Sequence, residues 1–212
     1  AGETNIKLEK EIETDAPIVR PAAASTFSWR KSTPVGITID LNGKTLNNPN
    51  GYAIENKGNL FIKNGTIKGL GGIRSKAGSV TIDDIKIYAS SKWQDSNYQH
   101  SLKAENSTVV INSGDFDATK YGHTNAMFNA SENSTITING GNFKNIAGAL
   151  GTFDPYIFTY EKNGKLIING GTFHGGWRFN GETATTEING GSFTVGFDGQ
   201  SFNASSTHKL TV

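Results

Sequence analysis

A short alternating pattern of apolar and polar residues recurs along most of this chain. Each copy has two apolar positions separated by one residue of variable type, then a turn rich in Asn and Gly, then a second short stretch that carries Phe or Ile. The clearest copies are residues 134–143, STITINGGNF, and residues 164–173, GKLIINGGTF. Alternation with a period of two predicts half-buried β-strands, and Asn-Gly predicts the tight turns between them.

The spacing of the copies predicts how these strands are arranged. The first inward apolar positions are Ile37, Leu60, Val80, Val109, Ile136, Leu166, Thr186 and Leu210. A third short apolar stretch, such as residues 52–54 or 127–128, lies between successive copies. A constant motif separated by segments of variable length predicts an all-β parallel solenoid, in which about eight coils of three short strands stack like residues on like.

The turn asparagines are expected to lie at one corner of each coil. They are Asn64, Asn112, Asn139, Asn169 and Asn189. Asn and Gly tolerate a positive φ, and stacked amides can form hydrogen bonds along the solenoid axis. These asparagines are therefore interpreted as structural.

The first 35 residues lack the repeat and are expected to form a cap. Apolar residues in this segment, such as Ile6, Ile12 and Ile18, would make a first irregular coil that covers the core and the unpaired strand edge. The predicted division is therefore an N-terminal cap at 1–35 and a β-helix at 36–212, together forming one domain.

The repeat resembles the right-handed parallel β-helix proteins of the pectate-lyase-like superfamily, most of all phage tail-spike, tail-fibre and capsid-fibre modules. Residues 40–46, DLNGKTL, followed by 51–67, GYAIENKGNLFIKNGTI, are similar to the opening coils of such proteins. The resemblance covers about residues 36–212. It implies a right-handed β-helix, but a fold by itself does not determine a function.

Composition excludes several classes of function. The formal net charge of +1 is too balanced for the basic surface that binding to a nucleic acid requires. The chain has no cysteine, so a disulfide scaffold, a thiolate metal site and a cysteine nucleophile are excluded. No apolar run is long enough to span a membrane, and the first residues lack the pattern of a signal peptide, although Ala1 could follow a removed Met or a cleaved leader.

Three long loops are expected to carry the function. They cover about 88–100, 117–126 and 144–156, and they leave consecutive coils at one corner, where stacking would bring them together. The predicted ligand-binding residues within them are Trp93, Tyr98, Gln99, Tyr121, His123, Asp154 and Tyr156. Aromatic planes beside polar groups suit the stacking of a sugar ring or a protein interface; packing of the loops onto the coils is the alternative.

Catalytic chemistry is poorly supplied. Glycosidases need two carboxylates on one face. Asp83 and Asp84 are interpreted as replacements for turn asparagines. Asp154 is the one candidate for a catalytic residue. The four histidines lack the spacing of metal ligands, so no metal or other cofactor is predicted.

The outward position of the alternating strand carries Phe61, Val110 and Ile167. This position is more apolar than a solvated face requires, so it reflects either β-propensity or a contact surface, which a homotrimer would use.

Together these features predict a non-enzymatic virion appendage, a phage capsid or tail fibre or spike module. It would attach to a host-surface polysaccharide or to other virion proteins and would lie on the virion surface. One alternative is a carbohydrate-active β-helix enzyme, a polysaccharide lyase or glycosidase. A second is a bacterial surface adhesin fragment, which would be extracellular or on the cell surface.

Overall fold

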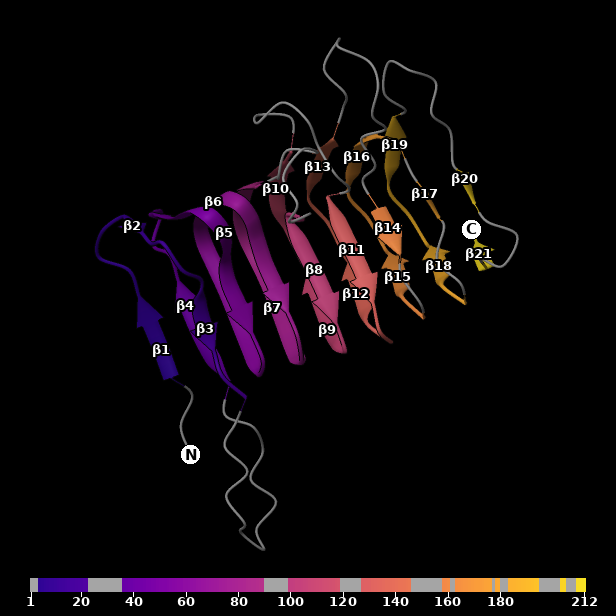
Figure 1. Ribbon diagram of the computed structural model, residues 1–212. Helices are drawn as coiled ribbons and strands as arrows, with labels where there is room; N and C mark the ends of the chain where they lie inside the picture. The colour runs from indigo at the N-terminus through magenta and orange to yellow at the C-terminus, as the bar shows by residue number, and fades with distance from the viewer. Residues whose placement is uncertain are drawn as a thin grey trace, which may run out of the picture.

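The computed structural model describes residues 4–22, 36–89, 99–118, 127–145, 158–160, 163–176, 178–179, 183–194, 203–204 and 209–212. Within these ranges every regular element is a β-strand, and every pairing between strands is parallel. Nineteen strands form one curled sheet, and β17 (Arg178–Phe179) pairs with β20 (Asn203–Ala204) in a second, smaller one. The fold is all-β and solenoid-like, with strands following one another in chain order from β1 to β21 (Figure 1).

The alternating segment of the repeat forms the first of three rows of paired strands, here called row 1. It consists of β1 (Thr4–Lys7), β4 (Ile37–Asp40), the beginnings of β6 (Asn59–Ser75) and β7 (Gly78–Ala89), β9 (Ser107–Ile111), β12 (Thr135–Ile138), β15 (Lys165–Ile168), β18 (Thr185–Ile188) and β21 (Lys209–Thr211). The register aligns all eight predicted inward positions, from Ile37 to Leu210. The positions from Leu60 to Thr186 are buried and Ile37 is partly buried, which confirms these seven as inward. Two residues further on, eight isoleucines from Ile6 to Ile188 are aligned in one line, and those from Ile39 to Ile168 are buried in the core.

Row 2 follows the turn and carries the aromatic core. It consists of β2 (Ile12–Glu13), the beginning of β5 (Thr45–Asn56), the middle of β6, the end of β7, β10 (Gly114–Asp117), β13 (Asn142–Asn145), β16 (Thr172–Gly175) and β19 (Ser192–Thr194). Phe143 stacks on Phe173 with ring centroids 4.8 Å apart, and Phe173 on Phe193 at 4.9 Å. Such pairs add to the stabilisation that burial of the rings already supplies.

Row 3 closes the repeat. It consists of β3 (Ile18–Arg20), the ends of β5 and β6, β8 (Leu102–Glu105), β11 (Phe128–Ser131) and β14 (Phe158–Tyr160). Its inward Phe128 meets Phe116 of row 2 at a centroid distance of 5.3 Å, so rows 2 and 3 share one core. β5 and β6 bend through more than one row, which shows directly that the sheet curls (Figure 1).

The turn between rows 1 and 2 contains the predicted amide ladder, with two corrections. Asn139 donates from Nδ2 to Oδ1 of Asn112 at 3.0 Å, Asn169 to Asn139 at 2.9 Å and Asn189 to Asn169 at 2.9 Å. Asn64 does not belong to this ladder: it lies one residue past the equivalent position, which Lys63 occupies, and donates to Asp40 instead.

The second correction concerns the backbone of these turns. Positive φ falls on the glycines that follow the ladder, such as Gly141 (119°) and Gly171 (113°), and not on the ladder asparagines themselves. The asparagines are therefore needed for their amides, and the glycines for the left-handed conformation.

A second polar ladder, which the sequence analysis did not identify, lies between rows 3 and 1. Asn106 donates to Glu132 at 2.8 Å, Asn163 donates to Asn133 at 3.0 Å, and Thr183 donates to Asn163. All five residues have a positive φ, between 47° and 64°. At this corner, residues of consecutive repeats therefore share an uncommon left-handed backbone conformation, and their side chains form hydrogen bonds from one repeat to the next.

The N-terminal segment continues the same three rows. β1 pairs with β4, and β2 and β3 both pair with β5, so residues 4–20 form short regular strands. Ile6 and Val19 are 43% and 51% exposed at this end of the sheet. The division at residue 35 and the capping role remain predictions.

Candidate functional site

The three long loops are attached to neighbouring strands. The chain leaves row 2 at the ends of β7, β10 and β13 and returns to row 3 at the starts of β8, β11 and β14. Where the chain leaves row 2, Phe116 pairs across the strands with Ile87 on one side and Phe143 on the other. Where it returns to row 3, Phe128 pairs in the same way with Leu102 and Phe158. Because neighbouring strands lie about 4.8 Å apart, the attachment points form one continuous corner, here called the loop corner.

Most of the predicted ligand-binding residues lie outside the described residues. They are Trp93, Tyr98, Tyr121, His123, Asp154 and Tyr156. Their part in binding, and that of Asp154 in catalysis, remains a prediction.

Gln99 is described, and it packs against the body of the protein. Its side chain lies over two glycines of β5 and β6: a Cβ atom added at Gly71 would come within 2.6 Å of Gln99 Oε1, and one at Gly51 within 3.8 Å of Gln99 Nε2. Beside it, the backbone N–H of His100 donates to the Tyr52 hydroxyl at 3.2 Å. Burial raises the pKa of Tyr52 to about 12, so its hydroxyl is protonated at neutral pH.

At the base of the loop corner, Tyr88 at the end of β7 lies beside two carboxylates of the neighbouring strand β10. Asp115 and Asp117 are both half-buried on the outer side of β10, where they alternate with the buried Phe116. Burial first, and then the charges of Asp115 and Asp117, raise the pKa of Tyr88, and Asp115 also forms a hydrogen bond with it. Lys144 pairs with Asp117 in the adjacent strand, so groups of both signs are available beside the loops.

The predicted oligomer residues share one line on the outside of row 1. Phe61 pairs with Thr81, Thr81 with Val110, Val110 with Thr137 and Thr137 with Ile167. All of them are half-buried in the single chain. The contact with another chain remains a prediction.

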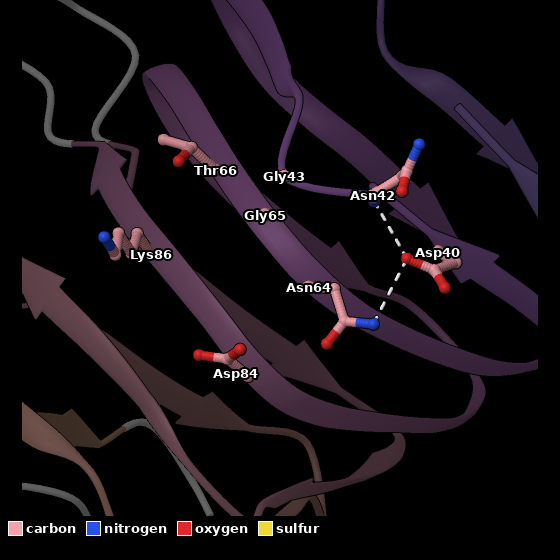
Figure 2. A pocket seen from close by; sticks show the side chains of 8 residues that line it. All are labelled: Asp40, Asn42, Gly43, Asn64, Gly65, Thr66, Asp84 and Lys86. Carbon is pink, nitrogen blue, oxygen red and sulfur yellow. Dashed lines mark hydrogen bonds between the residues drawn. The ribbon is translucent and has the colours of Figure 1, made fainter. Parts of the chain in front are cut away.

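A separate depression opens at the corner between rows 1 and 2, in the first repeats of the sheet. It has a volume of about 440 Å³ and is lined by Asp40, Asn42, Gly43, Asn64, Gly65, Thr66, Asp84 and Lys86. Figure 2 shows these residues around the turn, with Asp40 and Asn42 on one side and Asp84 and Lys86 on the other. We call it the corner depression.

The length of the first turn accounts for this depression. Asp40 pairs with Lys63 and Thr45 pairs with Thr66. The segment from Asp40 to Thr45 is therefore two residues longer than the segment of β6 from Lys63 to Thr66 that lies beside it. Leu41 takes a buried place in the core, whereas Asn42 and Gly43 are exposed and project beside the next coil. Their positive φ values, 52° and 74°, suit Asn and Gly.

Asp40 is held ionised at the edge of the depression. The backbone N–H of Asn42 donates to its Oδ1 at 2.8 Å and Asn64 Nδ2 donates to the same atom at 3.3 Å. The Asn42 bond above all, assisted by Asn64 and by the charge of Lys63, lowers the pKa of Asp40. These interactions hold Asp40 in place as a structural acceptor.

Sequence reasoning missed this depression. Its signal was present in the motif DLNGKT at 40–45, which is two residues longer than the equivalent KNGT at 63–66. Turn length identifies a depression only when the pairing register is known.

Known proteins offer no guide to the site: no protein family, curated protein or solved structure matches the chain. In the described ranges no three His, Asp or Glu side chains group so that they could hold a metal ion. The same residues contain no helix long and apolar enough to cross a membrane.

Proposed function

We propose that the chain is a right-handed parallel β-helix of about eight coils that serves as a non-enzymatic attachment module and presents the loop corner to a host-surface polysaccharide. The observation that carries the proposal is the register of the loop attachments. Three long segments begin on paired strands and end on paired strands, so one extended ligand could touch all of them. Their aromatic residues would supply the stacking surfaces.

Handedness follows from a general rule of parallel sheets. A connection between parallel strands of the same sheet is right-handed in about 98% of cases, because twisted strands pack back on the sheet only in that way. Here every connection from one repeat to the next joins parallel strands.

Three of the described carboxylates are unsuited to act as the acid of a glycosidase. A glycosidase needs one carboxylic acid whose pKa is raised so that it can donate a proton. Asp40 and Glu105 have lowered pKa values, since hydrogen bonds and nearby cations stabilise their ionised forms. Asp83 accepts a hydrogen bond from Ser113 at 2.6 Å and has a structural part in its turn.

The place of such a module in a virion appendage rests on the resemblance of the repeat to phage fibre and spike modules. Assembly as a homotrimer would cover the apolar outward line of Phe61, Val110 and Ile167. Attachment to other virion proteins would use the same loop corner.

The test is binding of the full chain to a panel of purified bacterial capsular and O-antigen polysaccharides. Removing the ring in Trp93→Ala, Tyr121→Ala or Tyr156→Ala should weaken binding about 5- to 150-fold each, the range for aromatic residues at interfaces. Trp93→Phe keeps an aromatic plane and serves as the matched control, with circular dichroism to verify the fold.

Two results would contradict the proposal. One is unchanged binding after all three rings are removed. The other is release of new reducing or unsaturated ends from a polysaccharide, lost in Asp154→Asn, which would establish the enzyme alternative.

A further inference from the structure

The corner depression lies where the asparagine ladder of its corner is interrupted. Further along the sheet, Asn112, Asn139, Asn169 and Asn189 form a chain of amide–amide hydrogen bonds from one repeat to the next. In the first repeats the ladder positions hold Asp40, Lys63 and Asp83. A break in a repeat at the point where the surface is hollowed is a reason to look for a ligand.

Three side chains of the lining have polar groups that are not used in holding the fold together. The Thr66 hydroxyl, the Asp84 carboxylate and the Lys86 ammonium group make no hydrogen bond or ion pair with other described residues. Asp84 and Lys86 are exposed and Thr66 is half-buried. In the same lining, the Asn64 side-chain oxygen remains available while its nitrogen is bound to Asp40 (Figure 2).

These groups alternate between donors and acceptors, and their charges offset one another. Lys63 lies 3.8 Å from Asp40, and Lys86 follows Asp84 two residues later, so neither sign dominates. Each hydroxyl of a sugar donates one hydrogen bond and accepts others. Neighbouring hydroxyls therefore fit a carboxylate or amide oxygen beside an ammonium or hydroxyl group.

We propose that the corner depression binds one neutral hexose unit, with Asp84 and Asn64 accepting from sugar hydroxyls and Thr66 and Lys86 donating to them. A volume of about 440 Å³ is sufficient for a single sugar ring. This site lies at a different corner from the loops and does not depend on the proposed function.

The lining contains no aromatic ring, so the contact is weak. For a ligand of about 12 non-hydrogen atoms bound by hydrogen bonds alone, the dissociation constant is expected on the order of 1–10 mM.

The experiment is an NMR titration of the ¹⁵N-labelled full chain with methyl β-glucoside, methyl β-galactoside and methyl α-mannoside, with glucuronate and CaCl₂ as separate arms. At least one neutral glycoside should shift the amides of Asn42, Asn64 and Thr66 in a saturable manner. Lys86→Ala and Asp84→Asn should each weaken this binding about tenfold, the usual effect of losing a charged hydrogen-bonding partner. Asn tolerates the φ of 49° at position 84, so the second variant should fold even if the first does not.

Lys68→Ala is the matched control, because Lys68 is a half-buried outward lysine of the same sheet that does not line the depression. Its affinity for the glycoside should equal that of the wild type. The proposal is overturned if no neutral glycoside shifts these amides, if only glucuronate or Ca²⁺ does, or if both lining variants bind like the wild type. Trp93→Ala should leave this titration unchanged, and Lys86→Ala should leave polysaccharide binding at the loop corner unchanged, so the two sites can fail separately.

Discussion

At the scale of single residues, Arg74 and Glu105 form a two-bond ion pair on the outside of row 3. Arg74 Nε and Nη2 donate to the two carboxylate oxygens of Glu105 at 2.7 and 3.0 Å, and Lys103 lies 3.1 Å from Oε1. The Glu105 side chain is only 13% exposed. Burial alone would raise the pKa of Glu105, but the hydrogen bonds from Arg74 and Lys103 outweigh it and the pKa is lowered.

We expect Glu105→Gln to lower the free energy of unfolding by about 1–2 kcal/mol at pH 7, as loss of a partly buried charged hydrogen-bonding partner does. Because the folded-state pKa of Glu105 lies below its ordinary value of 4.5, its contribution is complete above that value and fades as the pH falls through the folded-state pKa. Urea denaturation at several pH values measures this difference.

Glu187→Gln is the control for that experiment, because Glu187 is 43% exposed and its nearest lysine nitrogen is 3.9 Å away. It should cost less than about 0.5 kcal/mol. An effect of Glu105→Gln that is absent at pH 7, or that grows towards acid, would show that the pair does not stabilise the fold.

At the scale of elements, stability depends on like residues stacking from strand to strand. In the line of isoleucines, Ile138 packs between Ile111 and Ile168, the equivalent residues of the two neighbouring strands. Parallel strands bring equivalent side chains into register, so a gap in one repeat is felt by both neighbours.

Ile138→Ala should therefore destabilise the protein by about 3–5 kcal/mol, because the site is fully buried and the stack on either side cannot collapse into the cavity. Ile188→Ala, at the half-buried end of the line, is the matched control and should cost about 1–2 kcal/mol. Denaturant unfolding followed by circular dichroism measures both; equal losses at the two positions would argue against the stacked core.

At the scale of the whole molecule, the outside of row 1 is a continuous sheet face crossed by one partly apolar line. Phe61, Val110 and Ile167 lie on this line with threonines between them. A self-complementary apolar line suits symmetric assembly, and a trimer is the assembly that we propose.

We expect the double variant Phe61→Lys, Ile167→Lys to sediment as a smaller species than the wild type and to keep its β-sheet signal, since like charges facing each other disfavour closure. Thr45→Lys with Thr172→Lys adds the same charge to the outside of row 2 and is the control that should leave the mass unchanged. A wild-type chain that remains a monomer at high concentration would exclude the trimer.

The sequence by itself determined the rows. A side-chain period of two predicts the inward positions from Ile37 to Leu210. The turns after the first have a constant length, which is why the amide ladder from Asn112 to Asn189 could be predicted. The position of the loop corner also follows from the sequence, because all three long segments lie between the second and the third strand of their repeats.

Only the tertiary structure decided which polar residues meet across repeats. Arg74 and Glu105 are 31 residues apart, and Asn106 and Glu132 are 26 apart, with no local pattern that pairs them. The Asn-Gly at Asn64 matches the others in sequence and predicts a place in the ladder, yet Asn64 stands one residue out of register. The corner depression exists because two extra residues of one turn project beside a shorter neighbouring turn. Such features depend on how two neighbouring segments differ in length or in register. These differences bring side chains together or apart only once the strands have paired.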